Sequence, residues 1–165
     1  MSLQVEISVE ADAWTALPDL SGLTERTIAA CQRVSDVPLR DGAEVSLLFA
    51  GDVAVHALNK RFRGVDKATN VLSFPGTGDA ETAEFLGDIA IAFETADREA
   101  KDEGKPLDHH VAHLIAHGFL HLLGFDHETA EEAEDMEAME REILESLGIP
   151  DPYAGTSLAD EPLEP

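Results

Sequence analysis

The stretch His117–His127 reads HGFLHLLGFDH and holds three of the seven histidines of the chain. His117 and His121 are four residues apart, so on a helix both imidazoles project from the same face, about one turn apart. Gly124 provides a natural end for that helix, because glycine permits a sharp turn without steric cost. His127 can then fold back toward the other two imidazoles. We therefore predict that His117, His121 and His127 bind one metal ion.

The ligand types indicate zinc with one open coordination position. Structural zinc sites commonly have four protein ligands and favour cysteine, whereas catalytic sites keep a position for water or substrate. No Cys or His follows His127, and Cys31 is the only cysteine. Zinc on three neutral imidazoles lowers the pKa of bound water to about 7 and polarises a phosphoryl or carbonyl oxygen. We predict one zinc ion per chain and hydrolytic chemistry, with a structural zinc as the alternative.

Three further histidines precede the motif on the same expected helix. A helix rotates by about 40° beyond one turn over four residues, so His113 is expected in the core or as a hydrogen-bond partner of a ligand. His109 and His110 are expected at the surface or at the start of the helix.

The spacing of the motif equals the zinc-site pattern of the metzincin proteases, except at Gly118. Those proteases have their glutamate general base at this position, so the glycine argues against a zinc peptidase, which stays an alternative. Asp126 and Glu128 flank His127, and each either orients a ligating imidazole or is a solvated acid.

Hydrophobic periodicity divides the rest of the chain into strands and helices. Strands are predicted at 3–9, 44–50, 70–74 and 86–93, and helices at 21–35, 52–62, 94–103, 106–123 and 130–147. In helix 52–62, Val53 and Lys60 share one face with His56 or Ala57. In helix 130–147, the apolar face carries Met136, either Met139 or Glu140, and Ile143.

Length and composition indicate one globular domain. The 165 residues are 44% hydrophobic and 27% charged, and the domain is expected to span 1–150, followed by an acidic, proline-rich tail at 151–165 that is predicted to be disordered. No apolar run approaches the ~20 residues of a membrane span. The start of the chain has no secretory pattern and Cys31 is alone, so the expected location is the cytoplasm.

The charge is strongly negative overall but unevenly distributed. The formal net charge of −23 argues against strong unaided binding to nucleic acid. Four of the eleven basic residues lie within eight positions, however: Lys60, Arg61, Arg63 and Lys67. They make one surface locally positive or simply solvate a loop, and charge alone favours the second interpretation.

Three further blocks accompany the histidine motif in the order LNKRFR (58–63), TNVLSFP (69–75) and LGDI (86–89). Together with the Glu- and Met-rich helix that follows His127, they resemble the YbeY family of bacterial rRNA-processing endoribonucleases from about Val45 to Asp151. The sequence departs from the pattern at Ala68, where many relatives have proline.

The resemblance implies a zincin-like, single-domain α+β fold with about four strands in a mixed sheet packed on helices, including a central metal-binding helix. It implies a single-strand-specific endoribonuclease in 3′-end maturation of small-subunit rRNA and in ribosome quality control, with single-stranded RNA and the ribosomal small subunit or its associated proteins as partners. By the same motifs, Arg63 takes the position of the family's functionally important arginine, which favours a catalytic and substrate-binding role over a surface ion pair, and His117 is expected to be catalytic as well as a metal ligand. Lys60 and Ser73 are further expected to bind substrate, although Ser73 equally fits a structural role in its strand. A planar guanidinium suits bidentate phosphate contact.

Two questions stay open from the sequence. Because Gly118 replaces the usual glutamate, the general base is a metal-bound hydroxide, another carboxylate or the 2′-hydroxyl of the RNA. Besides the peptidase, a ribosome-associated binding protein with a mainly structural zinc is an alternative, in which the acidic helix 130–147 contacts basic proteins. The sequence does not specify an oligomeric state.

Overall fold

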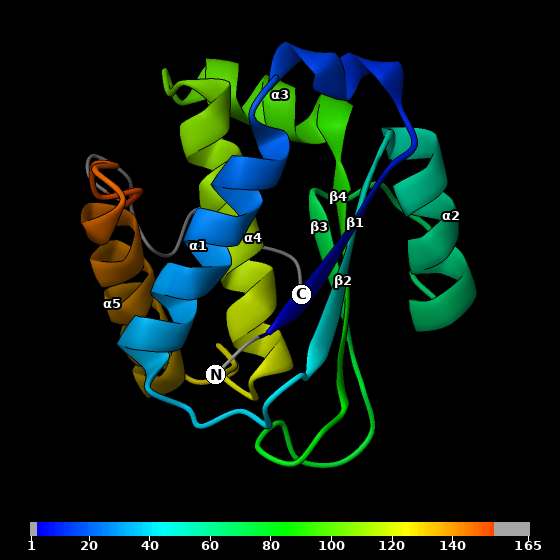
Figure 1. The fold of residues 1–165 in the computed structure, drawn as a ribbon. Coiled ribbons are helices and arrows are strands. Elements are labelled where there is room, and N and C mark those ends of the chain that lie inside the picture. Colours follow the sequence, from blue (N-terminus) through cyan, green and yellow to red (C-terminus); the bar gives the residue numbers. More distant parts are fainter. Residues whose placement is uncertain (1–2, 154–165) are drawn as a thin grey trace.

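Four strands form one mixed sheet in the order β1-β2-β4-β3 (Figure 1). The computed structural model describes residues 3–153. Strands β1 (Gln4–Val9), β2 (Glu44–Ala50) and β4 (Phe85–Ala92) are parallel, and β3 (Val71–Pro75) pairs antiparallel with β4 at one edge of the sheet. This arrangement confirms the expected α+β class and the mixed four-stranded sheet.

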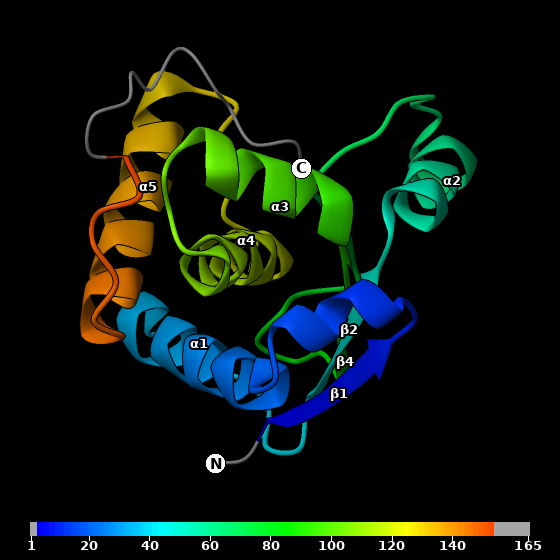
Figure 2. The same cartoon turned by 90° about the horizontal axis from the view of Figure 1, so that it is seen from above.

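The helices cover the two faces of the sheet unequally. Figure 2 shows α1 (Leu20–Ser35), α3 (Phe93–Asp102) and α5 (Ala130–Ser146) grouped around a central α4 (Leu107–Leu122) on one face. The helix α2 (Asp52–Arg63) lies on the opposite face (Figures 1 and 2). The main hydrophobic core fills the α4 side, and a smaller cluster of Ala50, Val55, Leu72, Ala90 and Ala92 lies under α2. Within the described residues, no helix is long and apolar enough to cross a membrane.

The central position of α4 follows from its composition. Its residues from His110 to Leu120 are all buried, and a helix that is apolar on every side is stable only in the interior. The pyrrolidine of Pro106 precedes its first turn, where no intrahelical N–H bond is required. The chain leaves its C-terminus through Gly124, whose φ of 105° is a conformation that L side chains rarely adopt.

Gly118 allows α4 to approach the sheet closely. A Cβ at this position would lie 3.0 Å from Cγ2 of Ile89 on β4 and 3.1 Å from Oγ of Ser73 on β3. The Ser73 hydroxyl also donates a hydrogen bond of 3.2 Å to the carbonyl oxygen of Gly118. The glycine therefore lets α4 and β3 pack closely side by side.

Two features differ from the expectations. A 3₁₀ helix, η1 (Asp12–Ala16), was not predicted; it buries Trp14, whose indole Nε1 donates to the carbonyl oxygen of Ala50. The face of α2 that carries Val53 is not its buried face, because Val53 is 88% exposed and the helix buries Val55 and Asn59. Val55 packs against the small cluster, and Asn59 donates to the carbonyl oxygen of Lys67.

Candidate metal centre

The three histidines of the motif converge at the C-terminal end of α4. His117 and His121 project from the helix with their Nε2 atoms 3.1 Å apart, and His127 comes from the loop before α5. One ligand atom from each of the three lies within 4.8 Å of the others. The predicted helix-and-return geometry is therefore present.

The loop that carries His127 is held at both ends. After the turn at Gly124, the backbone N–H of His127 donates to the carboxylate of Asp126 at 2.8 Å. Two residues further on, Thr129 and Glu132 form a reciprocal capping box that starts α5. Asp126 thus shapes the backbone at His127.

The cluster has the properties of a metal-binding site. Nε2 of His127 is buried and has no hydrogen-bond partner among the described residues, a costly state that a cation would relieve. Burial, together with the nearby His117 and His127, lowers the pKa of His121 to about 4, so this imidazole is neutral near pH ~7 and its lone pair is available. These three residues can hold a metal ion.

Glu140 on α5 is a central residue that the sequence interpretation missed. Its side chain is fully buried, and its Oε2 accepts a hydrogen bond of 2.7 Å from Nδ1 of His117. This bond fixes the proton on Nδ1 and leaves Nε2 of His117 as the ligand atom. Burial alone would raise the pKa of Glu140, but the charges and hydrogen bonds of His113 and His117 outweigh it and hold the pKa well below its usual range.

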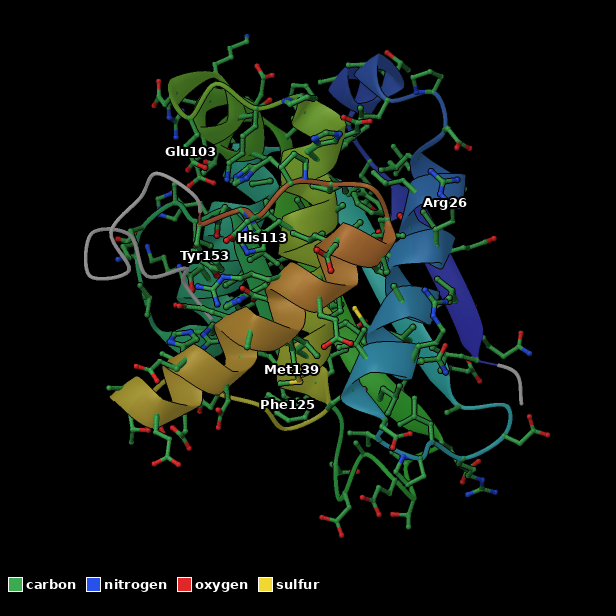
Figure 3. The ribbon with its side chains drawn as sticks, turned by 90° about the vertical axis from the view of Figure 1, so that its left-hand side faces the viewer. Arg26, Glu103, His113, Phe125, Met139 and Tyr153 are labelled. Atoms are coloured by element: carbon green, nitrogen blue, oxygen red, sulfur yellow. The ribbon has the colours of Figure 1, made fainter. Side chains whose placement is uncertain are left out.

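The other carboxylate oxygen of Glu140 joins His113 and Tyr153 to the site. Figure 3 labels these two residues, which lie close together. Nε2 of His113 lies 3.1 Å from Oε1 of Glu140, and the Tyr153 hydroxyl donates to the same oxygen. The rings of His113 and Tyr153 meet edge to face, with centroids 5.3 Å apart. Burial and the adjacent Glu140 raise the pKa of the Tyr153 hydroxyl, so it stays a donor. His113 is thus both a core residue and a partner of the ligand network, as expected.

His110 lies in the first turn of α4, which is one of the two expected positions, but its side chain is buried. It is 2% exposed, and its Nε2 lies 2.8 Å from Oε1 of Glu99 on α3. Asn70 donates to the same carboxylate. His110 therefore ties α4 to α3 and to the start of β3, away from the three-histidine cluster.

An open cavity of about 430 Å³ lies in front of the cluster. Its lining consists of Arg63, Ser73, Pro75, His121, Gly124, Phe125, Asp126, His127 and Glu128. Arg63 is held at the wall by a 3.3 Å hydrogen bond from Nη1 to the carbonyl oxygen of Ser73. The structure therefore brings together Arg63, Ser73 and two of the three histidines from four separate segments of the chain.

Lys60 does not line this cavity. Its side chain is exposed on α2, and its Nζ lies 3.9 Å from a carboxylate oxygen of Asp66 in the loop between α2 and β3. Ser73 does line the cavity, but its hydroxyl donates to the backbone of Gly118. Of the three residues expected to bind substrate, Arg63 has the clearest position for contact with an anionic group.

The mixed sheet and the buried helix with its converging histidines define an α+β protein with a three-histidine site of the kind that metal-dependent hydrolases use. Residues 7–148 match the family model described as Endoribonuclease YbeY, and the chain therefore belongs to this family of RNA-cleaving enzymes.

Individual relatives agree with the family match. Proteins named Endoribonuclease YbeY are 52% identical in Methylocella silvestris, over 90% of this chain and 85% of the relative, and 48% identical in a Bradyrhizobium strain, over 94% of this chain and 95% of the relative. The solution structure of TM1509 from Thermotoga maritima has the same fold, with a TM-score of 0.58 at 21% identity over 96% of this chain and 100% of that protein.

Proposed function

We propose that this chain is a zinc-dependent, single-strand-specific endoribonuclease that acts in 3′-end maturation of small-subunit rRNA and in ribosome quality control. The family match supports cleavage of RNA. The observation that carries the proposal is the shared cavity, which is lined both by Arg63 and by His121 and His127 of the histidine cluster. Because rRNA is processed in the bacterial cytoplasm, the proposal also places the protein there, with the small subunit or its proteins as partners.

One zinc ion per chain, held by His117, His121 and His127, fits the all-imidazole donor set. Bound there, zinc would supply Lewis acidity toward a phosphoryl oxygen and would acidify water. Glu140 keeps Nε2 of His117 free of a proton and holds the ring in place through Nδ1. A buried carboxylate in this position also increases the basicity of the imidazole.

Arg63 is proposed to bind the scissile phosphate. Its guanidinium presents several N–H donors in one plane, and its bond to Ser73 leaves donors available for a phosphate in the cavity. A fixed cation at this position stabilises the negative charge that grows on the phosphoryl oxygens during cleavage. In this role Arg63 contacts the reacting group, so it is a catalytic residue as well as a binding residue.

The proton that the attacking group loses needs an acceptor on the chain or on the RNA. At position 118 this chain has glycine in place of the glutamate that serves in the metzincin pattern, and an added Cβ there would lie 3.0 Å from Ile89 and 3.1 Å from Ser73. The cavity offers two other carboxylates, Asp126 and Glu128, of which Asp126 already accepts from the backbone of His127. Glu128 is therefore the first candidate for the proton acceptor, and the 2′-hydroxyl route is the alternative. The absence of a glutamate at position 118 also disfavours a peptidase.

The proposal is tested by metal content and RNA cleavage of the native, His117→Ala and Arg63→Ala proteins. We expect about one zinc per chain in the native protein, loss of both metal and cleavage in H117A, and normal metal with a roughly 100-fold slower cleavage in R63A. Cleavage that survives in H117A would identify a contaminating nuclease. Full activity in R63A would remove the role assigned to Arg63.

A further inference from the structure

A second hollow lies on the face of the sheet opposite the histidines. This groove of about 300 Å³ runs between α2 and the strands β2, β3 and β4. It is lined by Leu48, Leu58, Phe62, Phe74, Asp88, Ile89 and Ala90. Figures 1 and 2 show α2 as the helix on this face, and the main group of helices does not reach it.

Phe62 at the mouth of this groove is an unusually exposed aromatic residue. Its side chain is 60% exposed, although it is part of the last turn of α2. Its ring meets the edge of Phe74 with centroids 5.9 Å apart. The guanidinium carbon of Arg61 lies 5.0 Å from the centroid of the same ring. An exposed ring beside a cation is the combination with which single-strand binders stack bases.

The charge around Phe62 favours a polyanion as the occupant. The chain as a whole carries −23, but Lys60, Arg61 and Arg63 surround Phe62 in sequence on one helical turn. Asp66 offsets part of this charge through its contacts with Lys60 and His56. A basic cluster of this density on an acidic protein complements phosphate, and the apolar groove beside it complements a planar base.

At two places in the chain, one residue lines the groove and its neighbour in sequence lines the metal cavity. On β3, Ser73 lines the metal cavity and the next residue, Phe74, lines the groove, because alternate side chains of a strand point to opposite faces. On α2, Arg63 lines the cavity and the preceding residue, Phe62, lines the groove. The strand that separates the two sites is the edge strand of the sheet, so a ligand can pass over it.

We propose that the groove is a nucleobase subsite, in which the RNA strand crosses β3 from the phosphate at Arg63 and stacks a neighbouring base on Phe62. This inference rests on the proposed endoribonuclease function. Asp88 at the groove wall accepts hydrogen bonds and repels phosphate, so the groove takes a base and favours those with an exocyclic amino group. Phe62 is thus a substrate-binding residue that uses no contact with the metal.

The test compares Phe62→Leu with Phe62→Tyr and with Phe85→Leu in the zinc-loaded protein. Phe85 is a matched control because it is 42% exposed but lies on β4 outside both the groove and the basic cluster. The probe is a short, fluorescently labelled single-stranded RNA with 2′-O-methyl groups, which block cleavage by the 2′-hydroxyl route. Binding is followed by anisotropy, and a gel after each measurement checks that the RNA is still intact. We expect F62L to weaken binding about 10-fold, and F62Y and F85L to leave it unchanged. With cleavable RNA, F62L should raise KM and leave kcat unaltered.

A series of RNAs, each with one abasic nucleotide, identifies the stacked base. At one position next to the cleaved bond, loss of the base should weaken RNA binding by the native protein as much as the F62L substitution does. The same abasic RNA should bind F62L no more weakly than the intact RNA does. If every abasic RNA loses affinity equally in both proteins, the subsite is refuted. If F62L binds RNA as tightly as F85L does while the native protein still cleaves RNA, the groove serves another partner, such as an apolar protein segment. In that case only this inference fails. A native protein that neither binds nor cleaves RNA would refute the proposed function itself.

Discussion

Glu140 shows how one buried carboxylate can control a site that it does not line. It accepts from the ligand candidate His117 through one oxygen and meets His113 and Tyr153 through the other. The apolar-face pattern of helix 130–147 left Met139 and Glu140 as alternatives for the same face. The structure buries Glu140 completely and leaves Met139 partly buried at the edge of the core.

We predict that Glu140→Gln weakens zinc binding by about 10–100-fold, because the neutral amide no longer increases the basicity of His117. The measurement is competition with a chelator of known affinity at neutral pH. Glu142→Gln is the matched control, since this residue is exposed on the same helix. An E140Q protein that is folded and binds zinc as tightly as E142Q would contradict the positioning role.

Residue patterns explain which parts of the site were visible in the sequence. His117 and His121 are related by helical spacing and His127 by a nearby glycine turn, so local rules predict their convergence. Glu140 and Tyr153 reach His113 from 27 and 40 positions away, and no local rule describes that contact. The signal that was available is a carboxylate at a core position of an amphipathic helix, which requires a partner. The same limit explains His110, whose partner Glu99 lies on another helix.

Among the elements, α4 is the one whose placement is most strongly determined. It is buried on all sides, and its approach to β3 and β4 depends on the missing side chain of Gly118. The strands and helices were predicted to within about one residue at their ends because alternation and helical periodicity were clear. Periodicity does not specify the buried face of α2, because this helix covers only a small cluster and leaves even Val53 exposed.

Gly118→Ala should destabilise the fold by about 1–3 kcal/mol, because the added methyl group meets Ile89 and Ser73 in a closely packed layer. Thermal or urea unfolding measures the change. Gly22→Ala on α1 is the control, since the three atoms nearest its new methyl group all belong to the side chain of Asp19, which can rotate away. Alanine also favours the helix by up to ~1 kcal/mol. If G118A were stabilised as much as G22A, the prediction would be wrong, and α4 would have room to shift away from the sheet.

For the whole molecule, the main core accounts for the fold without a metal. The sheet and the helices around α4 bury residues from every part of the described chain, from Trp14 to Ile149. Zinc binding adds stability in proportion to its affinity and concentration, without supplying the core.

We therefore predict that removal of zinc by a chelator lowers the Tm of the protein and abolishes RNA cleavage but leaves its far-UV circular dichroism nearly unchanged at 25 °C. Restored zinc should recover both properties. Unfolding on chelation would instead support the ribosome-associated binding protein with a structural zinc. The single-domain boundary at residue 150 stays a prediction, and most of the acidic tail at 151–165 lies outside the described residues.

The isolation of α2 gives the two halves of the substrate site different local stabilities. His117 and His121 lie on the most enclosed helix, whereas Phe62 and Arg63 end a helix that packs through Val55 on a small buried cluster. Local opening of α2 therefore costs less free energy than opening of α4. The metal centre would then stay preorganised when the last turn of α2 opens, and an RNA bound across β3 as proposed would hold that turn closed.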